Sequence, residues 1–171
     1  MHNRTFLMCF CVPIWERKTQ GKDVILIMKI PVDIRLKTES ISMYSADDGN
    51  TETSDLSFKG DLQKVDNGYI IQYRSNFTDN TIAVFEKMIT VNRSGQISSQ
   101  LVFEEGRSYF GTFSDNINTI QMNTITKHLE SKLTEQGGCF LIDYSISYGG
   151  TMFERNRVTY TVIPEEGNIA S

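Results

Sequence analysis

The stretch that decides the fold runs from Val91 to Phe113 and reads VNRSGQISSQLVFEEGRSYFGTF. Its two turn dipeptides, Ser94-Gly95 and Glu105-Gly106, enclose a segment with the period of two that a pleated strand imposes. One face of this segment carries Ile97, Ser99, Leu101 and Phe103. The same parity continues beyond the second turn in Tyr109, Gly111 and Phe113. The stretch therefore predicts two antiparallel strands that share one mostly apolar face.

Similar alternating segments lie on both sides of this pair. They span residues 30–36, 56–62, 69–73, 81–85, 88–93, 140–148 and 151–163. Asn67-Gly68 and Gly149-Gly150 are strong turn signals, and we also predict a turn at Asp79-Asn80 and a polar hairpin tip from Ser45 to Ser54. Short strands at this spacing, without a convincing helix, predict an all-β domain. We expect a single closed or nearly closed antiparallel β-barrel of about 8–10 strands.

One segment, Thr126 to Glu135, fits two kinds of secondary structure. Leu129 and Leu133 lie four residues apart among charged neighbours, and Gly137-Gly138 would serve as a helix C-cap. The same residues also fit a strand. Periodicity alone leaves both interpretations open.

Composition limits the classes of partner. The chain of 171 residues has 17 basic and 21 acidic residues, a net charge of −4, with its Lys and Arg scattered. Such a chain is a poor electrostatic match for nucleic acid or an anionic membrane, so we expect neither as a partner. Its odd number of cysteines, three, favours a reducing compartment. We therefore predict a cytoplasmic monomer or small homo-oligomer.

The first 27 residues do not continue the strand pattern. Phe6 to Trp15 is apolar but is interrupted by Pro13, is too short to span a bilayer, and is followed by no small-residue cleavage site. We interpret residues 1–27 as a leader foreign to the domain, with translation beginning at Met28. The barrel is expected to cover residues 28–163, followed by a polar tail, residues 164–171.

The order and spacing of several features point to a family. They are Met28-Lys29-Ile30-Pro31-Val32, Ile34-Arg35-Leu36-Lys37-Thr38, the Arg93-Ser94-Gly95 turn with the strand after it, Gly106 with Gly111, and the Gly149-Gly150 hairpin. Together they resemble the YwiB-like bacterial proteins over about Met28 to Ile163. One departure is Asp115-Asn116-Ile117-Asn118, where relatives usually carry Thr-Pro-aromatic-Gly.

This resemblance implies a calycin-like, or lipocalin-like, β-barrel. It also implies that Thr126 to Glu135 is a strand with Leu129, Ser131 and Leu133 on one face. It implies no known activity, because the YwiB-like group is itself uncharacterised.

Residues for enzyme chemistry are scarce in the predicted barrel. It contains one histidine, His128, and one cysteine, Cys139, so neither a Ser-His-Asp constellation nor a zinc site is indicated. We expect His128 to be a surface or rim residue and Cys139 a small strand hydrophobe. Gly106 and Gly111 lack the following helix that a phosphate-binding loop requires. We predict a protein that is not an enzyme and needs no cofactor or metal.

Two functions from different classes fit such a barrel. The first is binding of a small amphiphilic ligand inside it. The second is a structural or interaction module whose interior is filled by its own side chains and which docks on a protein or ribonucleoprotein partner. The choice depends on whether bulky inward residues line a cavity or fill it. The candidate ligand-binding residues are Arg93, Phe58, Tyr73, Phe103, Phe113 and Tyr144.

Arg93 has the parity of Ile89 and Val91, so it points inward if they do, at a strand end just before a turn. Its guanidinium has five donors and cannot lose its charge. One hypothesis is that it anchors the carboxylate or phosphate of the ligand. The other is that it closes the barrel end by bonding backbone carbonyls and stacking on an aromatic ring. We expect the structural role, in which replacing Arg93 lowers stability without any ligand present.

Overall fold

The computed structural model describes residues 28–42, 51–149 and 151–165, in which every strand joins one closed antiparallel barrel. No helix occurs in these ranges. The prediction of an all-β barrel is therefore confirmed. The strands are β1 (Lys29–Ser42), β2 (Thr51–Val65), β3 (Gly68–Ser75), β4 (Thr78–Phe85), β5 (Ile89–Gly95), β6 (Ser98–Phe103), β7 (Ser108–Ser114), β8 (Thr119–Thr134), β9 (Gly137–Tyr148) and β10 (Thr151–Pro164).

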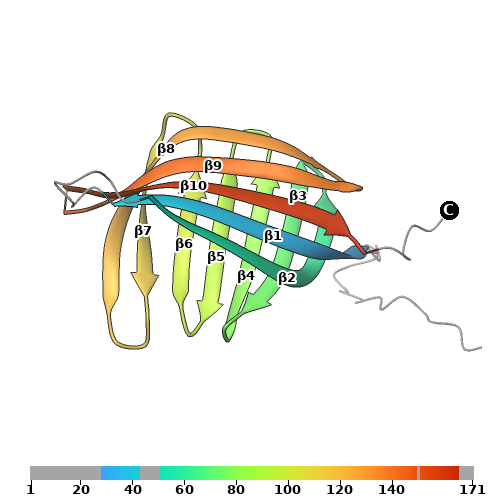
Figure 1. The fold of residues 1–171 in the computed structure, drawn as a ribbon, viewed down its shortest axis with the longest axis horizontal. Coiled ribbons are helices and arrows are strands. Elements are labelled where there is room, and N and C mark those ends of the chain that lie inside the picture. The colour runs from blue at the N-terminus through green and yellow to red at the C-terminus, as the bar shows by residue number, and fades with distance from the viewer. Residues whose placement is uncertain (1–27, 43–50, 150, 166–171) are drawn as a thin grey trace, which may run out of the picture.

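The topology is simple. Each strand pairs with the next one along the chain, and pairing of β1 with β10 closes the barrel. Figure 1 shows the long strands β8, β9, β10, β1 and β2 lying across the shorter strands β3 to β6. The wall therefore has a long-strand side and a short-strand side, whose inward side chains meet in the interior.

The β3–β4 turn differs from the prediction. It lies at Asn76 and Phe77, whose φ angles are 45° and 60°, whereas Asp79 and Asn80 belong to β4. Asn80 is buried, and its Nδ2 donates a hydrogen bond to the carbonyl of Thr78, 3.1 Å away. The prediction of a turn at Asp79-Asn80 was wrong because this amide is used inside the barrel to hold the turn that precedes it.

The predicted hairpin tip from Ser45 to Ser54 is also revised. Thr51 to Ser54 are the first residues of β2 and pair with residues 38–41 of β1. All four side chains are exposed, so backbone pairing rather than burial keeps them in a strand. Residues 45–50 lie outside the described ranges, as do residues 1–27.

Segment 126–135 is a strand, as the resemblance implied, because β8 extends to Thr134. A register shift between Thr126 and His128 marks a β-bulge. Met122 and Thr126 are buried before the bulge, and Leu133, of opposite parity, is buried after it. The bulge therefore explains why, within one continuous strand, the buried residues have even numbers before it and an odd number after it.

Glu105 holds this bulge from outside the barrel. Its Oε2 accepts a hydrogen bond from the backbone N–H of Leu129 at 3.0 Å and lies 2.9 Å from Nδ1 of His128. The bond from Leu129 and then that from His128 hold the pKa of the Glu105 carboxyl below its usual range. His128 is thus a surface residue, as predicted, and is engaged in a structural contact.

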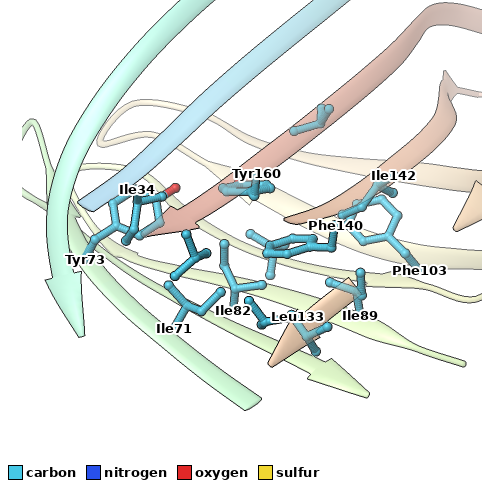
Figure 2. Packing of buried hydrophobic residues seen from close by; sticks show 14 of the residues in the cluster. Ile34, Ile71, Tyr73, Ile82, Ile89, Phe103, Leu133, Phe140, Ile142 and Tyr160 are labelled. Carbon is cyan, nitrogen blue, oxygen red and sulfur yellow. The ribbon is translucent and has the colours of Figure 1, made fainter. Parts of the chain in front are cut away.

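The interior is packed by side chains from every strand. Figure 2 shows aromatic and branched residues from both sides of the wall meeting there. Three ring pairs have centroids 4.7 to 4.8 Å apart: Phe58 with Tyr73, Phe103 with Tyr144, and Phe140 with Tyr160. Such contacts stabilise the rings beyond the burial of their area. The buried apolar core consists of Val32, Ile34, Leu62, Ile71, Tyr73, Ile82, Val84, Ile89, Val91, Leu101, Phe103, Met122, Leu133, Phe140, Ile142, Val158, Tyr160 and Val162.

Asp143 provides a test of the β9–β10 pairing. Its carboxylate, only 4% exposed, accepts two hydrogen bonds from Arg155, at 3.2 and 3.0 Å, and Arg157 lies 3.8 Å away. The hydrogen bonds from Arg155 hold the pKa of Asp143 below its ordinary value of 3.8. A carboxyl whose pKa is lower in the folded state stabilises the fold above the unfolded pKa. This stabilisation is lost as the pH falls through the folded pKa.

We expect Asp143→Asn to lower the melting temperature at neutral pH, because an amide cannot replace the charged bonds to Arg155. The deficit should shrink as the pH falls from the ordinary carboxyl pKa of 3.8 through the lower pKa of folded Asp143, where the native carboxyl also becomes neutral. Thermal unfolding of both proteins across this pH range measures the difference. A deficit that does not change with pH would show that the ionised carboxylate does not contribute.

Candidate functional site

Arg93 places a charged group at one end of the packed interior. It lies at the end of β5, after the buried residues Ile89 and Val91, and its side chain is half-buried. Its pairing partners are Asn80 on β4 and Ser99 on β6. We call this end, where β5 passes into β6, the Arg93 end of the barrel.

The positive charge of Arg93 acts on three tyrosines from other strands. Burial raises the pKa of Tyr144 to about 12 and that of Tyr160 well above its usual range, while the positive charge of Arg93 lowers both. Burial also raises the pKa of Tyr73, which a hydrogen bond with Tyr160 and the charge of Arg93 lower. All three phenols are therefore neutral at physiological pH. Arg93 is the cation in this group, close enough for its charge to act on each ring.

Two rows of polar side chains meet at the Arg93 end. The first row, on the short strands, contains Asn80, Arg93 and Ser99 as direct neighbours. The second row, on the long strands, contains Thr126, Tyr144, Asn156 and Ser40, also direct neighbours. Tyr144 of the second row contacts Phe103 on β6, the strand that carries Ser99, with ring centroids 4.7 Å apart, so the two rows face each other across the interior. A polar layer therefore lies next to the apolar core.

Several polar groups in this layer are not satisfied by the protein. Ser99 is 8% exposed and Thr126 is 1% exposed, and neither hydroxyl has a hydrogen-bond partner in the described part of the chain. Asn156 differs, since its Oδ1 accepts a bond of 2.6 Å from Ser40. A buried hydroxyl without a partner costs about 1–3 kcal/mol. Ser99 and Thr126 thus each carry a buried hydroxyl that makes no hydrogen bond to the described protein.

The half-buried guanidinium of Arg93 also lacks a partner among the described residues. No hydrogen bond or ion pair links it to any residue in the ranges 28–42, 51–149 and 151–165. Glu154 is close enough to Tyr144 to raise the pKa of that phenol, yet it forms no ion pair with Arg93. The carbonyl bonds and ring stacking expected for a structural role are not among the contacts of Arg93. None of its N–H groups donates to an acceptor in the described residues.

The predicted aromatic site residues are packed against one another. Phe58 and Tyr73 form one ring pair, and Phe103 and Tyr144 form another. Phe113 is half-buried and lies opposite Ser99, next to the Arg93 row. The structure therefore places all six candidate residues in one interior, but only Arg93, Tyr73, Tyr144 and Phe113 adjoin the polar layer. Phe103, 1% exposed, is a core residue.

Two depressions of the described chain do not include Arg93 or Tyr144. One depression, of about 310 Å³, lies along β2, β3 and β4, and its lining includes Lys59, Gln72 and Arg74. A second, of about 440 Å³, lies at the β4–β5 turn around Glu86 and Lys87. Both are surface features.

The sequence did not identify Asn80, Ser99, Thr126 and Tyr160 as members of the site. The parity of Ser99 was visible, but only the register of β5 with β6 shows that it is the neighbour of Arg93. Tyr160 and Thr126 lie on the long strands, so their relation to Arg93 depends on how the two sides of the wall face each other. That arrangement leaves no local signal in the sequence.

Two negative findings apply to the described residues. They contain no cluster of three or more His, Cys, Asp or Glu side chains that could hold a metal ion. They also form no helix with the length and apolar character needed to cross a membrane.

Comparisons with known proteins agree with the fold. A family model described as a domain of unknown function (DUF1934) matches residues 34–159. The structure is similar to the crystal structure of ywiB protein from Bacillus subtilis, with a TM-score of 0.70 and 22% sequence identity, over 81% of this chain and 95% of that chain. No curated protein matches the chain. The resemblance to the YwiB-like proteins is therefore confirmed, and at this identity the structural likeness speaks for the fold.

Proposed function

The chain belongs to the DUF1934 family, and we propose that it binds a small anionic ligand at the Arg93 end of its barrel. The observation that carries this proposal is the half-buried guanidinium of Arg93, which no acceptor in the described chain satisfies. A charge that is partly removed from water and left unpaired is costly. A ligand that supplies a carboxylate or phosphate offsets that cost.

The chemistry of the neighbours supports an anion. A guanidinium binds a carboxylate or phosphate through two parallel hydrogen bonds, and such charge-assisted bonds are stronger in a site of low dielectric. The hydroxyl of Ser99, directly beside Arg93, has a free donor. The phenol of Tyr144, which stays neutral, provides another. These groups together suit several oxygen atoms on one small ligand.

The packed core limits the size of the ligand. Because Phe103 and Tyr144 contact each other, the apolar part of an amphiphile has no space deeper in the barrel. Phe113 is half-buried opposite Ser99 and remains available to a short apolar group. We therefore propose a compact anion with at most a short apolar portion, a narrower class than the amphiphile predicted from the sequence.

A thermal-shift screen tests this proposal. The probes are inorganic phosphate, a phosphate monoester, acetate and octanoate, and the wild-type protein is compared with Arg93→Gln and Arg93→Lys. A ligand at about 100 times its Kd stabilises a fold by about 2.7 kcal/mol. For a domain of this size, that corresponds to a rise in Tm of roughly 5–10 °C. We expect at least one probe to give such a shift, which Arg93→Gln abolishes and Arg93→Lys reduces.

The matched control is Arg74→Gln. Arg74 is an exposed arginine on β3 whose Nε lies 3.7 Å from Asp79, and its replacement should leave the ligand shift unchanged. If no probe shifts the wild type, or if Arg93→Gln keeps the full shift, Arg93 does not bind these anions. Equal losses with Arg74→Gln and Arg93→Gln would indicate nonspecific binding to positive charge.

The second hypothesis, an interaction module with a filled interior, also has support. The ring pairs fill much of the barrel, and Phe77 and Ile117, 79% and 88% exposed, lie at the β3–β4 and β7–β8 turns. Exposed aromatic and aliphatic residues are common at protein interfaces. A wild-type protein that ignores every anion in the screen would favour docking through such residues.

A further inference from the structure

A second charged side chain, that of Glu154, faces the interior of the barrel. Glu154 precedes Asn156 on β10 by two residues, so the two side chains lie on the same face of the strand. Asn156 is buried and Glu154 is half-buried. The pairing partner of Glu154 on β9 is Ile146, which packs against the apolar core. Since directly opposed residues of a sheet share a face, the carboxylate of Glu154 is on the inner face of the wall.

Glu154 lies next to the polar layer at the Arg93 end. Tyr144 is the pairing partner of Asn156, and Glu154 is two residues, about 7 Å, further along β10. The negative charge of Glu154 raises the pKa of the Tyr144 phenol, whereas the positive charge of Arg93 lowers it. A carboxylate on β10 and a guanidinium on β5 therefore act on the same buried ring.

These two opposite charges are not bonded to each other. Both side chains belong to the described residues, and no ion pair joins them. Glu154 also has no hydrogen bond or ion pair with any other residue in the described ranges. Residues 43–50, which follow β1 outside those ranges, include no Lys, Arg or His. A half-buried charge without a partner is costly, and here the cost arises once for each sign.

The buried hydroxyls of the layer provide a second, independent indication of a ligand. Ser99 is the direct neighbour of Arg93, and Thr126 is the direct neighbour of Tyr144, one row from Glu154. Both hydroxyls are more than nine-tenths buried and have no partner in the described chain. A hydroxyl donates to an anion and accepts from an ammonium group equally well. The layer therefore suits a ligand that carries both kinds of group.

We propose that the ligand held at the Arg93 end is a small zwitterion, whose carboxylate or phosphate binds Arg93 and whose ammonium group binds Glu154. This inference rests on the anion site proposed above and narrows its ligand class. Ser99 and Thr126 bond the remaining polar atoms. A short molecule with a charge at each end also suits the packed interior, because neither end has to enter the apolar core.

Pairs of compounds that differ by one amino group test the proposal. The pairs are butyrate with γ-aminobutyrate, and ethyl phosphate with phosphoethanolamine. Calorimetric titration of the full-length wild-type protein with each compound gives the ratio of the two affinities within a pair. A hydrogen bond to a charged group is strong enough to change an affinity on the order of 10-fold. We expect at least one of the two zwitterions to bind more tightly than its plain anion by that factor.

Variants of Glu154 locate the ammonium group. Glu154→Gln should abolish the preference for the zwitterion and keep the binding of the plain anion, because Arg93 is intact. Glu154→Asp retains the charge and should retain part of the preference. The matched control is Glu86→Gln, which removes an equal charge from an exposed residue between β4 and β5, at the other end of β5 from Arg93. It should bind every compound as the wild type does, and thermal unfolding without ligand checks that each variant folds.

The outcomes separate this proposal from the one on which it rests. If a plain anion binds through Arg93 but the amino group adds no affinity, or if Glu154→Gln keeps the preference, the zwitterion is overturned and the anion site stands. If no compound binds the wild type, or if Arg93→Gln binds them all equally well, both proposals fail. A preference that Glu154→Gln loses and Glu86→Gln keeps supports the zwitterion.

Discussion

Replacing Phe103 by alanine should lower the free energy of unfolding by about 3–5 kcal/mol. Phe103 is 1% exposed, and its ring centroid lies 4.7 Å from that of Tyr144 across the interior. The substitution removes apolar area and leaves a cavity between the two sides of the wall, which rigid neighbouring strands fill only in part. Equilibrium unfolding in urea measures the loss.

Val102→Ala is the matched control for this prediction. Val102 is the next residue on β6, has the opposite parity and is only partly buried. Its truncation should cost about 1 kcal/mol or less. Losses of similar size at the two positions would mean that the interior near Phe103 is loose, or that β6 has been assigned the wrong face.

Gly60→Ala should also destabilise the barrel strongly, by about 1–3 kcal/mol. Gly60 lies between β1 and β3, opposite Val32 and Tyr73. A Cβ atom at this position would overlap the backbone carbonyl of Gln72 and approach Cδ1 of Ile34 to 2.7 Å. Alanine would gain up to about 1 kcal/mol over glycine in chain entropy. The displacement of β3 outweighs this gain because a backbone carbonyl in a sheet cannot move alone.

Gly106→Ala separates the effect of contact from that of backbone conformation. Gly106 has a φ of 74°, and a Cβ atom there would meet nothing within 4 Å. Its replacement should cost only the local strain of a left-handed residue, about 1 kcal/mol. Thermal and urea unfolding of both variants tests the difference. A Gly60→Ala protein as stable as the wild type would contradict the tight approach of β2 and β3.

Local patterns predicted the strands better than their ends. Alternation gave the faces of β6 correctly because the period of two depends only on neighbouring residues. Asn80 was assigned to a turn because asparagine is common in turns, whereas here its amide is buried and bonds the preceding turn. The β-bulge at Thr126 could not be predicted, since it depends on Glu105, more than twenty residues earlier, accepting the N–H of Leu129.

The candidate site was predictable only in part, for a similar reason. The parity of Arg93 with Ile89 and Val91 placed it inward, and its side chain is half-buried there. What it meets depends on β9 and β10, which supply Tyr144 and Tyr160 across the interior. These contacts between distant segments follow from closure of the barrel, which no single stretch of sequence encodes.

The most direct test of the account is the stability of Arg93→Gln in buffer without polyvalent anions. If the guanidinium is held for a ligand and bonds to no part of the fold, its replacement should leave the free energy of unfolding within about 0.5 kcal/mol of the wild type, or raise it. Urea unfolding of the two proteins, measured side by side, gives this difference. A loss of about 2 kcal/mol or more would show that Arg93 closes the barrel end through bonds to the protein itself, and would contradict the account.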